Sequence, residues 1–359
     1  MRAAIIGCGN IAGVHAKNLR VLGIPLTLVV DPNEEALRTF ESHWGPAQTH
    51  NRWERVLDSD ADSVHICTPP ALHYEMVRSC LEHGKHVLCE KPLCLHTDEA
   101  RELTELAEAK GLVGAVNFNV SYYPAMQEAI RIIGSPAFGE PILVQGSYLQ
   151  GFHILPTEVS WRYQEQLAGP LRAVTEIGSH LIDLVVALTG RKIRSVSARL
   201  QSLTPKRVVR EGTMYPDPDG KSEEKRIRVD SDDLAVISFE MEGGLLGTLV
   251  LSEVSHGRVN QVRVEISGKN KNLWWDSEEC ARLMVGERET GITETRYPFD
   301  GGFPDSFLEL ARAYYKAVTG GQESGKELYP GFRRGWENLK VCNAILESSR
   351  QNGAWRPVE

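Results

Sequence analysis

The fold is decided near the start of the chain, in the stretch Ala3-Ala4-Ile5-Ile6-Gly7-Cys8-Gly9-Asn10-Ile11-Ala12. Its four apolar residues predict a buried strand, and apolar residues at helical spacing follow. The turn between them has the pattern G-x-G-x-x-A. The first glycine permits a tight turn, the second lets a pyrophosphate approach the backbone, and the small third residue allows the helix to pack closely on the strand. Free N–H groups at a helix start attract phosphates. The stretch therefore predicts a dinucleotide site at Gly7, Gly9, Asn10, Ile11 and Ala12.

Strands and helices alternate through the first third of the chain, which predicts a parallel sheet with right-handed crossovers. The expected strands are Ala3–Ile6, Leu26–Val30, Ser63–Cys67, His86–Leu88 and Leu112–Val116. The expected helices are Ile11–Val21, Glu34–His43, Tyr74–His83 and Asp98–Lys110. We take residues 1–120 as a dinucleotide-binding domain.

The pattern changes after residue 120, where longer strand-like segments follow one another through glycine-containing turns. They predict an antiparallel sheet, with strands at Pro141–Gln150, Ile193–Leu203, Leu234–Phe239, Leu245–Val254, Val259–Ile266 and Lys271–Trp275. Helices are expected at Tyr123–Ile133, Leu171–Leu188, Ser306–Val318 and Gly331–Ser348. The polar stretch Thr204–Asp230 is expected to be an exposed loop. Residues 121–359 thus form a second, α+β domain, whose last helix could pack back on the first.

Composition excludes several classes of protein. The 359 residues are 42% hydrophobic and 25% charged, as is usual for globular proteins, and the net charge of −8 disfavours nucleic-acid binding. No apolar run is long enough to cross a membrane. The apolar start of the chain is too short for a signal peptide and is expected to be a strand. The seven cysteines lack metal-site spacing, so we expect reduced thiols and a cytoplasmic location.

A carboxylate and a proline-rich turn are expected to complete the cofactor site. Asp31 lies just past the second strand, roughly twenty residues beyond the glycine turn, where it can accept hydrogen bonds from ribose hydroxyls. It would repel the 2′-phosphate of NADP, and no arginine follows to hold that phosphate, so NAD is preferred. Thr68 and Pro69 follow another strand and could flank the ribose and nicotinamide. His73 could either face the cofactor or cap the next helix.

Glu90-Lys91-Pro92 follows the strand beginning at His86 and is expected at the same sheet edge as the glycine turn. A lysine beside a nicotinamide can hydrogen-bond the oxygen whose charge changes during hydride transfer, or it can shuttle a proton. Glu90 could orient Lys91. The alternative is a surface ion pair before a helix.

Glu176, His180 and Asp183 occur at α-helical spacing i, i+4 and i+7, which places them on one face of the expected helix. A histidine can take a hydroxyl proton as hydride leaves the carbon, while neighbouring carboxylates orient it or bind a second hydroxyl. The alternative is a solvated helix face. No second cluster of ligands accompanies this single histidine, so no metal is expected.

Together these residues resemble the Gfo/Idh/MocA family (glucose–fructose oxidoreductase, inositol dehydrogenase, rhizopine catabolism). The similarity runs nearly end to end, through the glycine turn, Cys67-Thr68-Pro69 with His73, Glu90-Lys91-Pro92, Asn117-Phe118-Asn119, Gly178-Ser179-His180 with Asp183, and Gly331–Trp355. It implies an α/β protein with a Rossmann domain and an α+β domain. The second domain would contain a large, mostly antiparallel sheet whose outer face often mediates homodimers or homotetramers.

The resemblance also implies roles for individual residues. Lys91 and His180 match the catalytic pair, the acid at 176 matches a substrate-contacting residue, and Asn119 belongs to the cofactor side. The Lys91–Pro92 peptide bond is expected to be cis. The substrates implied are sugars, cyclitols and related polyols.

Two departures leave the substrate open. The family usually has Asp where this chain has Glu176, so that carboxylate extends about one methylene further. The family's frequent Asn-Tyr-Arg is Asn119-Val120-Ser121 here, without the arginine. Other pocket candidates are Tyr122, Trp161 and Arg162, although Trp161 could simply pin its loop.

We therefore expect an NAD-dependent oxidoreductase acting on a sugar or polyol. One alternative is a glycoside-cleaving enzyme that oxidises its substrate transiently. The other is a non-catalytic dinucleotide-binding regulator, which the presence of both Lys91 and His180 disfavours.

Overall fold

The computed structural model describes residues 1–217, 224–298, 302–320 and 329–359. It comprises two compact units: residues 1–119 with 304–339, and residues 120–303 with 340–359. We expected a single division between residues 120 and 121, whereas the structure assigns 304–339 to the first unit. Among the described residues, no helix is long and apolar enough to cross a membrane.

The first unit contains a six-stranded, fully parallel sheet in the order β3-β2-β1-β4-β5-β6. Its strands are β1 (Ala3–Ile6), β2 (Leu26–Val30), β3 (Gln48–His50), β4 (Ser63–Ile66), β5 (His86–Cys89) and β6 (Gly114–Val116). Its helices are α1 (Asn10–Leu22), α2 (Glu34–Trp44), α3 (His73–Glu82), α4 (Thr97–Lys110), α8 (Phe303–Val318) and the first part of α9 (Phe332–Arg350). The predicted parallel sheet is confirmed, and only the short β3 was not expected.

Strand β4 shows how the two faces of this sheet are covered. Val64 and Ile66 pack in an apolar cluster with residues of α3 and α4. The alternate residues Ser63 and His65 hydrogen-bond the hydroxyls of Tyr314 and Tyr315 in α8. Since side chains alternate across a strand, α8 covers the opposite face. The sheet is therefore buried on both sides.

The second unit is built on a nine-stranded sheet in the order β18-β17-β16-β15-β7-β14-β13-β9-β19. Its strands are β7 (Pro141–Leu149), β9 (Ile193–Gln201), β13 (Leu234–Met241), β14 (Leu245–Ser252), β15 (Gln261–Gly268), β16 (Lys271–Asp276), β17 (Arg282–Glu287), β18 (Gly291–Arg296) and β19 (Arg356–Pro357). All pairs are antiparallel except the parallel pair of β7 and β14. The predicted mostly antiparallel sheet is confirmed, although β17 to β19 were not expected.

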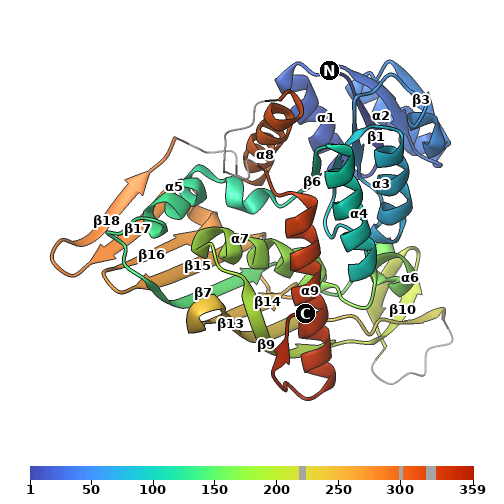
Figure 1. Cartoon of the computed structure of the whole chain (residues 1–359). Coiled ribbons are helices and arrows are strands. Elements are labelled where there is room, and N and C mark those ends of the chain that lie inside the picture. The colour runs from blue at the N-terminus through green and yellow to red at the C-terminus, as the bar shows by residue number, and fades with distance from the viewer. Residues whose placement is uncertain (218–223, 299–301, 321–328) are drawn as a thin grey trace. The chain divides into compact units, whose positions relative to one another are not determined.

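Helices α5 (Pro124–Ile133) and α7 (Ser179–Thr189) cover one face of this sheet (Figure 1). Burial alternates along β14: Leu249 and Leu251 lie in the core, whereas Leu246 and Val250 are exposed on the other face. The end of α9, from Val341 to Ile345, joins the same core. One face of the sheet is therefore packed, and along β14 the other face is exposed among the described residues.

One prediction for the second unit is wrong, and another is confirmed only in part. The stretch 204–230, expected as a loop, contains β10 (Lys206–Arg210), β11 (Thr213–Pro216) and β12 (Arg226–Arg228), although 218–223 lie outside the described residues. These strands and β8 (Thr157–Glu158) form a small antiparallel sheet. The expected helix 171–188 begins instead as a π-helical segment, Val174–Gly178, before α7. The short helix α6 (Glu165–Ala168) was not expected.

Candidate active site

The glycine turn lies where the strand order of the first unit reverses, between β1 and β4, which is where open α/β sheets bind ligands. Gly7 has φ +97°, and a Cβ there would lie 2.7 Å from the Cys67 carbonyl oxygen. Only glycine satisfies both constraints. A Cβ at Gly9, by contrast, would meet no atom within 4 Å, and no side chain caps α1. The turn therefore keeps space and helix-terminal N–H groups available for an anion.

Asp31 is hydrogen-bonded to the main chain on both of its carboxylate oxygens. Oδ2 accepts from Cys8 N at 2.7 Å and Oδ1 accepts from Asn33 N at 2.8 Å. Because each carboxylate oxygen has a second acceptor position, both can still receive ribose hydroxyls. Burial, together with the Asp31 charge, raises the pKa of the Cys8 thiol to about 12. The dinucleotide therefore fits this turn: Gly9 leaves room for a pyrophosphate, and Asp31 supplies the acceptors for a ribose.

His73 connects the proline-rich turn with the lysine loop. Its ring nitrogens lie 2.8 Å from the Thr68 carbonyl oxygen and 2.9 Å from the Pro92 carbonyl oxygen. The side chain is fully buried and does not cap α3. Burial lowers the pKa of His73. His73 therefore holds together the turns that carry Thr68–Pro69 and Lys91–Pro92.

Glu90 is the buried centre of the lysine loop. Its Oε1 accepts hydrogen bonds from Asn117 Nδ2 at 2.7 Å and from His15 Nε2 at 3.1 Å, and Oε2 accepts from Lys91 N at 3.3 Å. Burial raises its pKa, but the donors and the nearby cations outweigh burial and lower it to about 2. The Lys91–Pro92 peptide bond is cis, as the family resemblance implied. Glu90 is therefore a fixed anion next to Lys91.

Asn119, expected on the cofactor side, is fully buried and donates from Nδ2 to Ser306 Oγ of α8 at 2.7 Å. Thr68 Oγ1 contacts the sulfur of Met76. Asn10 and Ile11 begin α1, and the buried Ala12 packs beneath the turn. All the cofactor candidates lie in the first unit.

The catalytic candidates of the second unit lie at a junction between two kinds of helix. Glu176 belongs to the π-helical segment, whereas His180 and Asp183 belong to α7. A π-helical turn takes more residues than an α-helical turn, so the α-helical geometry from which we predicted a shared face for Glu176 and His180 does not hold across Val174–Gly178. Gly178 makes the close packing possible, since a Cβ there would lie 2.5 Å from a Leu251 methyl group. π-Helical turns of this kind are frequent at functional sites.

His180 and Asp183 are buried, and Asp183 Oδ2 accepts a hydrogen bond from Ser121 Oγ at 3.5 Å. Ser121 is the residue at which the family resemblance would have placed an arginine, and the structure pairs it with Asp183. Tyr122 ends the same 3₁₀ turn, Asn119–Tyr122, and is partly buried.

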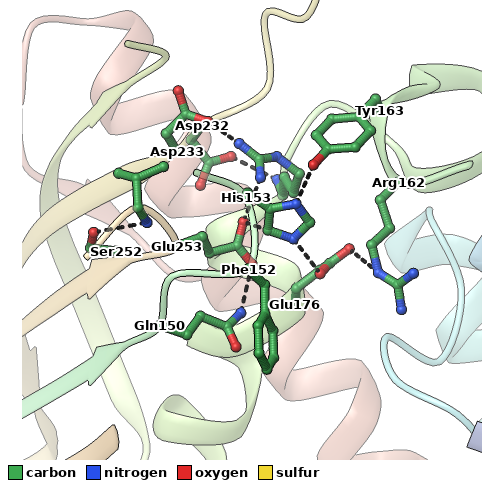
Figure 2. Close-up of polar contacts among 12 residues, drawn as sticks. Gln150, Phe152, His153, Arg162, Tyr163, Glu176, Asp232, Asp233, Ser252 and Glu253 are labelled. Atoms are coloured by element: carbon green, nitrogen blue, oxygen red, sulfur yellow. Dashed lines mark hydrogen bonds and ion pairs between the residues drawn. The ribbon is translucent and has the colours of Figure 1, made fainter. Parts of the chain in front are cut away.

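Glu176 pairs with two side chains from the loop before it, as Figure 2 shows. Arg162 Nε lies 3.0 Å from Glu176 Oε1, and His153 Nε2 lies 3.5 Å from Oε2. The Arg162 guanidinium also stacks on the Trp161 ring, 4.6 Å from its centroid. The structure therefore brings Arg162 and Trp161 to Glu176.

Behind Glu176 lies a buried charge network that the sequence analysis missed (Figure 2). Arg172 pairs with Glu253 at 2.9 Å and with Asp233, and Tyr163 contacts His153 through its hydroxyl. Asp232 accepts hydrogen bonds from the main-chain N–H groups of Arg172 and Val174, which fixes the start of the π-helical segment. The sequence feature that could have revealed this network is the acidic pair Asp232–Asp233, which lies directly before an apolar strand.

Ligand atoms of His153, Glu176 and Glu253 lie within 4.8 Å of one another, as in a metal site. Both carboxylates, however, already pair with the guanidinium groups of Arg162 and Arg172. These positive charges offset the carboxylates and repel a divalent cation. We therefore interpret the cluster as an ion-pair network.

Comparisons with known proteins agree with this architecture. Residues 1–118 match a model described as "Oxidoreductase family, NAD-binding Rossmann fold", and residues 126–273 match "GFO/IDH/MocA C-terminal domain". The levoglucosan dehydrogenase of Pseudarthrobacter phenanthrenivorans is 26% identical, with 92% of this chain and 89% of that protein covered. The myo-inositol 2-dehydrogenase of Thermotoga maritima is 22% identical, with 90% and 89% covered. The crystal structure of an NAD-binding oxidoreductase from Klebsiella pneumoniae matches with a TM-score of 0.86 and 26% identity, with 100% and 99% covered.

Proposed function

Because this chain belongs to the Gfo/Idh/MocA family of NAD-binding oxidoreductases, we propose that it transfers a hydride between nicotinamide and a hydroxyl-bearing carbon of a sugar, cyclitol or related polyol. The observation that carries this proposal is the construction of the lysine loop. Lys91 follows a buried, ionised Glu90 at the carboxyl end of β5, in the sheet whose glycine turn faces the same edge. The names of the dehydrogenase relatives support a polyol substrate.

Lys91 and His180 have separate tasks in the proposed reaction. Bound NAD supplies the hydride acceptor. His180 takes the hydroxyl proton, and Lys91 hydrogen-bonds the same oxygen as the alcohol becomes a carbonyl. The C–H hydride and the O–H proton both leave the substrate, which is thereby oxidised by two electrons. Asp183 and Glu176 position His180 or bind a further hydroxyl.

The remaining candidates are proposed to hold the cofactor and the substrate. Asp31 accepts the ribose hydroxyls and thereby favours NAD over NADP. Thr68, Pro69, His73, Glu90 and Asn119 shape the cofactor side. On the substrate side, Trp161 offers an apolar ring for a sugar face, and Arg162 and Tyr122 offer donors to its oxygens.

The outer face of the nine-stranded sheet is proposed to bind a second copy of this chain, forming a homodimer or homotetramer. Val236 and Val250 are paired across β13 and β14, and they and Leu246 are about half exposed on this face. Exposed apolar patches on a sheet mark interaction surfaces.

All seven cysteines are among the described residues and no disulfide joins any two, which supports a cytoplasmic location.

The purified protein, mixed with NAD and a panel including levoglucosan and myo-inositol, tests the proposed activity. Absorbance at 340 nm follows NADH. Formation of NADH with a polyol supports the proposal. Release of a sugar from glycosides without net NADH would replace it with transient oxidation, and tight NAD binding without turnover on the panel would replace it with a regulator.

A further inference from the structure

A chain of buried hydrogen bonds crosses the first unit and ends on Glu90, the residue before Lys91. The Tyr315 hydroxyl lies 2.7 Å from His65 Nε2, and His65 Nδ1 lies 2.7 Å from His15 Nδ1. His15 Nε2 then lies 3.1 Å from Glu90 Oε1. Tyr315, His65 and His15 are 6%, 1% and 0% exposed, so water does not compete for these contacts. The chain joins α8, β4, α1 and the end of β5.

The protonation of this chain follows from its ends. Glu90 is ionised and can only accept, so His15 Nε2 must carry a hydrogen. Two lone pairs cannot face each other at 2.7 Å, so one hydrogen lies between the two Nδ1 atoms. Burial and the neighbouring His15 lower the pKa of His65 well below its usual value, so His65 is neutral.

Two arrangements then satisfy every contact. In the first, His65 Nδ1–H donates to His15 and the Tyr315 hydroxyl donates to His65 Nε2. In the second, His15 Nδ1–H donates to His65, His65 Nε2–H donates to Tyr315, and that hydroxyl donates to Ser63 at 3.4 Å. The two differ by one proton on His15. Both keep His15 Nε2–H directed at Glu90, and Phe307 packs edge-on against the His15 ring, with centroids 4.5 Å apart.

Glu90 passes this fixed position on to Lys91. One carboxylate oxygen is held by His15 and Asn117, and the other accepts the main-chain N–H of Lys91. A rotation of the carboxylate would break at least two of these hydrogen bonds. The carboxylate therefore fixes both the main chain at Lys91 and a negative charge beside its ammonium group.

We propose that His15 is a positioning residue for Lys91 that acts through Glu90, with His65 and Tyr315 holding the His15 ring in place. This inference rests on the proposed role of Lys91 in hydride transfer. It adds that Lys91 depends on a hydrogen-bond donor, His15, that lies in α1, the helix that follows the glycine turn.

The other titratable groups around Glu90 define what a pH profile would report. They are Lys91, His73 and the thiols of Cys67 and Cys89. Burial raises the pKa of both thiols well above the usual value, so they stay neutral. Burial also lowers the pKa of His73. Because the pKa of Glu90 is about 2 and the proposed base His180 stops working once it is protonated, the acid limb of kcat/KM reports His180, so the test of His15 uses kcat and its rescue instead.

The test compares kcat and the KM for NAD in wild type, His15→Leu and His15→Gln, with levoglucosan or myo-inositol, whichever is oxidised faster. Loss of the His15 donor lets the Glu90 carboxylate rotate, so kcat of His15→Leu is expected to fall about 10-fold, the factor that a lost hydrogen bond to a charge is worth, while the KM for NAD changes far less. The amide of His15→Gln restores the donor and most of kcat. A variant that only loosens the fold would not be rescued by glutamine.

Tyr315→Phe and Tyr314→Phe form a matched pair, because both remove a buried hydroxyl from α8 but only Tyr315 bonds His65. Tyr315→Phe is expected to lower kcat in the direction of His15→Leu, and Tyr314→Phe to leave kcat close to the wild-type value. Equal kcat values for this pair would contradict the role of the chain.

Failure of the inference is distinguishable from failure of the proposed function. If Lys91→Met keeps full turnover, the proposed function fails whatever His15 does. If Lys91→Met loses turnover and kcat of His15→Leu equals the wild-type value, only the inference fails. Should His15→Leu not fold, ¹⁵N-histidine NMR of the wild type still decides: the inference requires a hydrogen on His15 Nε2 throughout the folded pH range, and a bare Nε2 would overturn it.

Discussion

The carboxylate of Asp31 accepts a hydrogen bond at 2.7 Å from the main-chain N–H of Cys8, inside the glycine turn. This contact ties the end of β2 to the turn after β1. The residue proposed to select the cofactor is therefore fixed by the same loop that is proposed to hold its pyrophosphate.

Replacing Asp31 by Ser should change cofactor preference. The variant loses the ribose acceptor and the negative charge, so we expect kcat/KM with NAD to fall roughly 10- to 100-fold, equivalent to about 1.4–2.8 kcal/mol. The ratio of NADP to NAD use should rise, because repulsion of the 2′-phosphate is removed. Initial rates with both cofactors measure this, and an unchanged ratio would contradict the role of Asp31.

The first unit shows how far sequence patterns reach. The glycine turn, Asp31 and the strands around them were predictable because a local pattern specifies each one. The placement of α8 against β4 was not, since it depends on Tyr314 and Tyr315 finding partners far away in the sequence.

The second unit was harder to predict for two physical reasons. The strands β10 to β12 are rich in charged residues, and we therefore predicted a loop there. Arg207 is nevertheless buried, because it pairs with Asp233. Glu176 was identified, but its partner His153 and the Arg172–Glu253 pair behind it come together only through the fold. The π-helical segment was invisible because no short pattern distinguishes it from an α-helix.

Glu176→Gln should weaken catalysis more than folding. Because Arg162 is 42% exposed, the lost ion pair costs at most about 1 kcal/mol of stability. We expect kcat/KM to fall roughly 10- to 100-fold if the carboxylate contacts the substrate or positions His180. Kinetics and thermal unfolding are compared with Glu128→Gln, which removes the exposed Arg131–Glu128 pair of α5. Equal kinetics for the two variants would remove Glu176 from the site.

Stability should fall in acid because of buried neutral histidines. The pKa of His65 lies well below 6.5 in the folded state, mainly through burial, while the unfolded chain takes a proton near 6.5. The stabilisation is therefore complete above pH 6.5 and is lost as the pH falls below it, by up to ~1.4 kcal/mol per unit.

Denaturant unfolding at several pH values measures this slope. His65→Gln should flatten it, whereas Tyr314→Phe should lower stability without changing it. His73 and His153, whose pKa values burial also lowers, should leave a residual slope in the first variant. An identical slope in wild type and His65→Gln would count against a neutral His65.

Self-association should depend on the outer sheet face. Val250→Glu places a charge on the outer sheet face, directly across from Val236 in β13. Because a charge disfavours burial in an apolar interface, we expect light scattering to report a smaller assembly than for the wild type. Val259→Glu is the matched control, since Val259 is 71% exposed but lies outside the strands. A monomeric wild type, or an unchanged mass for Val250→Glu, would exclude this interface.

The most direct test of hydride transfer assisted by Lys91 is NADH formation by Lys91→Met. The variant removes the cation but keeps an unbranched side chain, so it should still bind NAD. We predict that kcat/KM for the polyol that the wild type oxidises falls by roughly 10²- to 10⁴-fold, with NAD affinity changed far less. Full turnover of this variant at the wild-type rate would contradict the account.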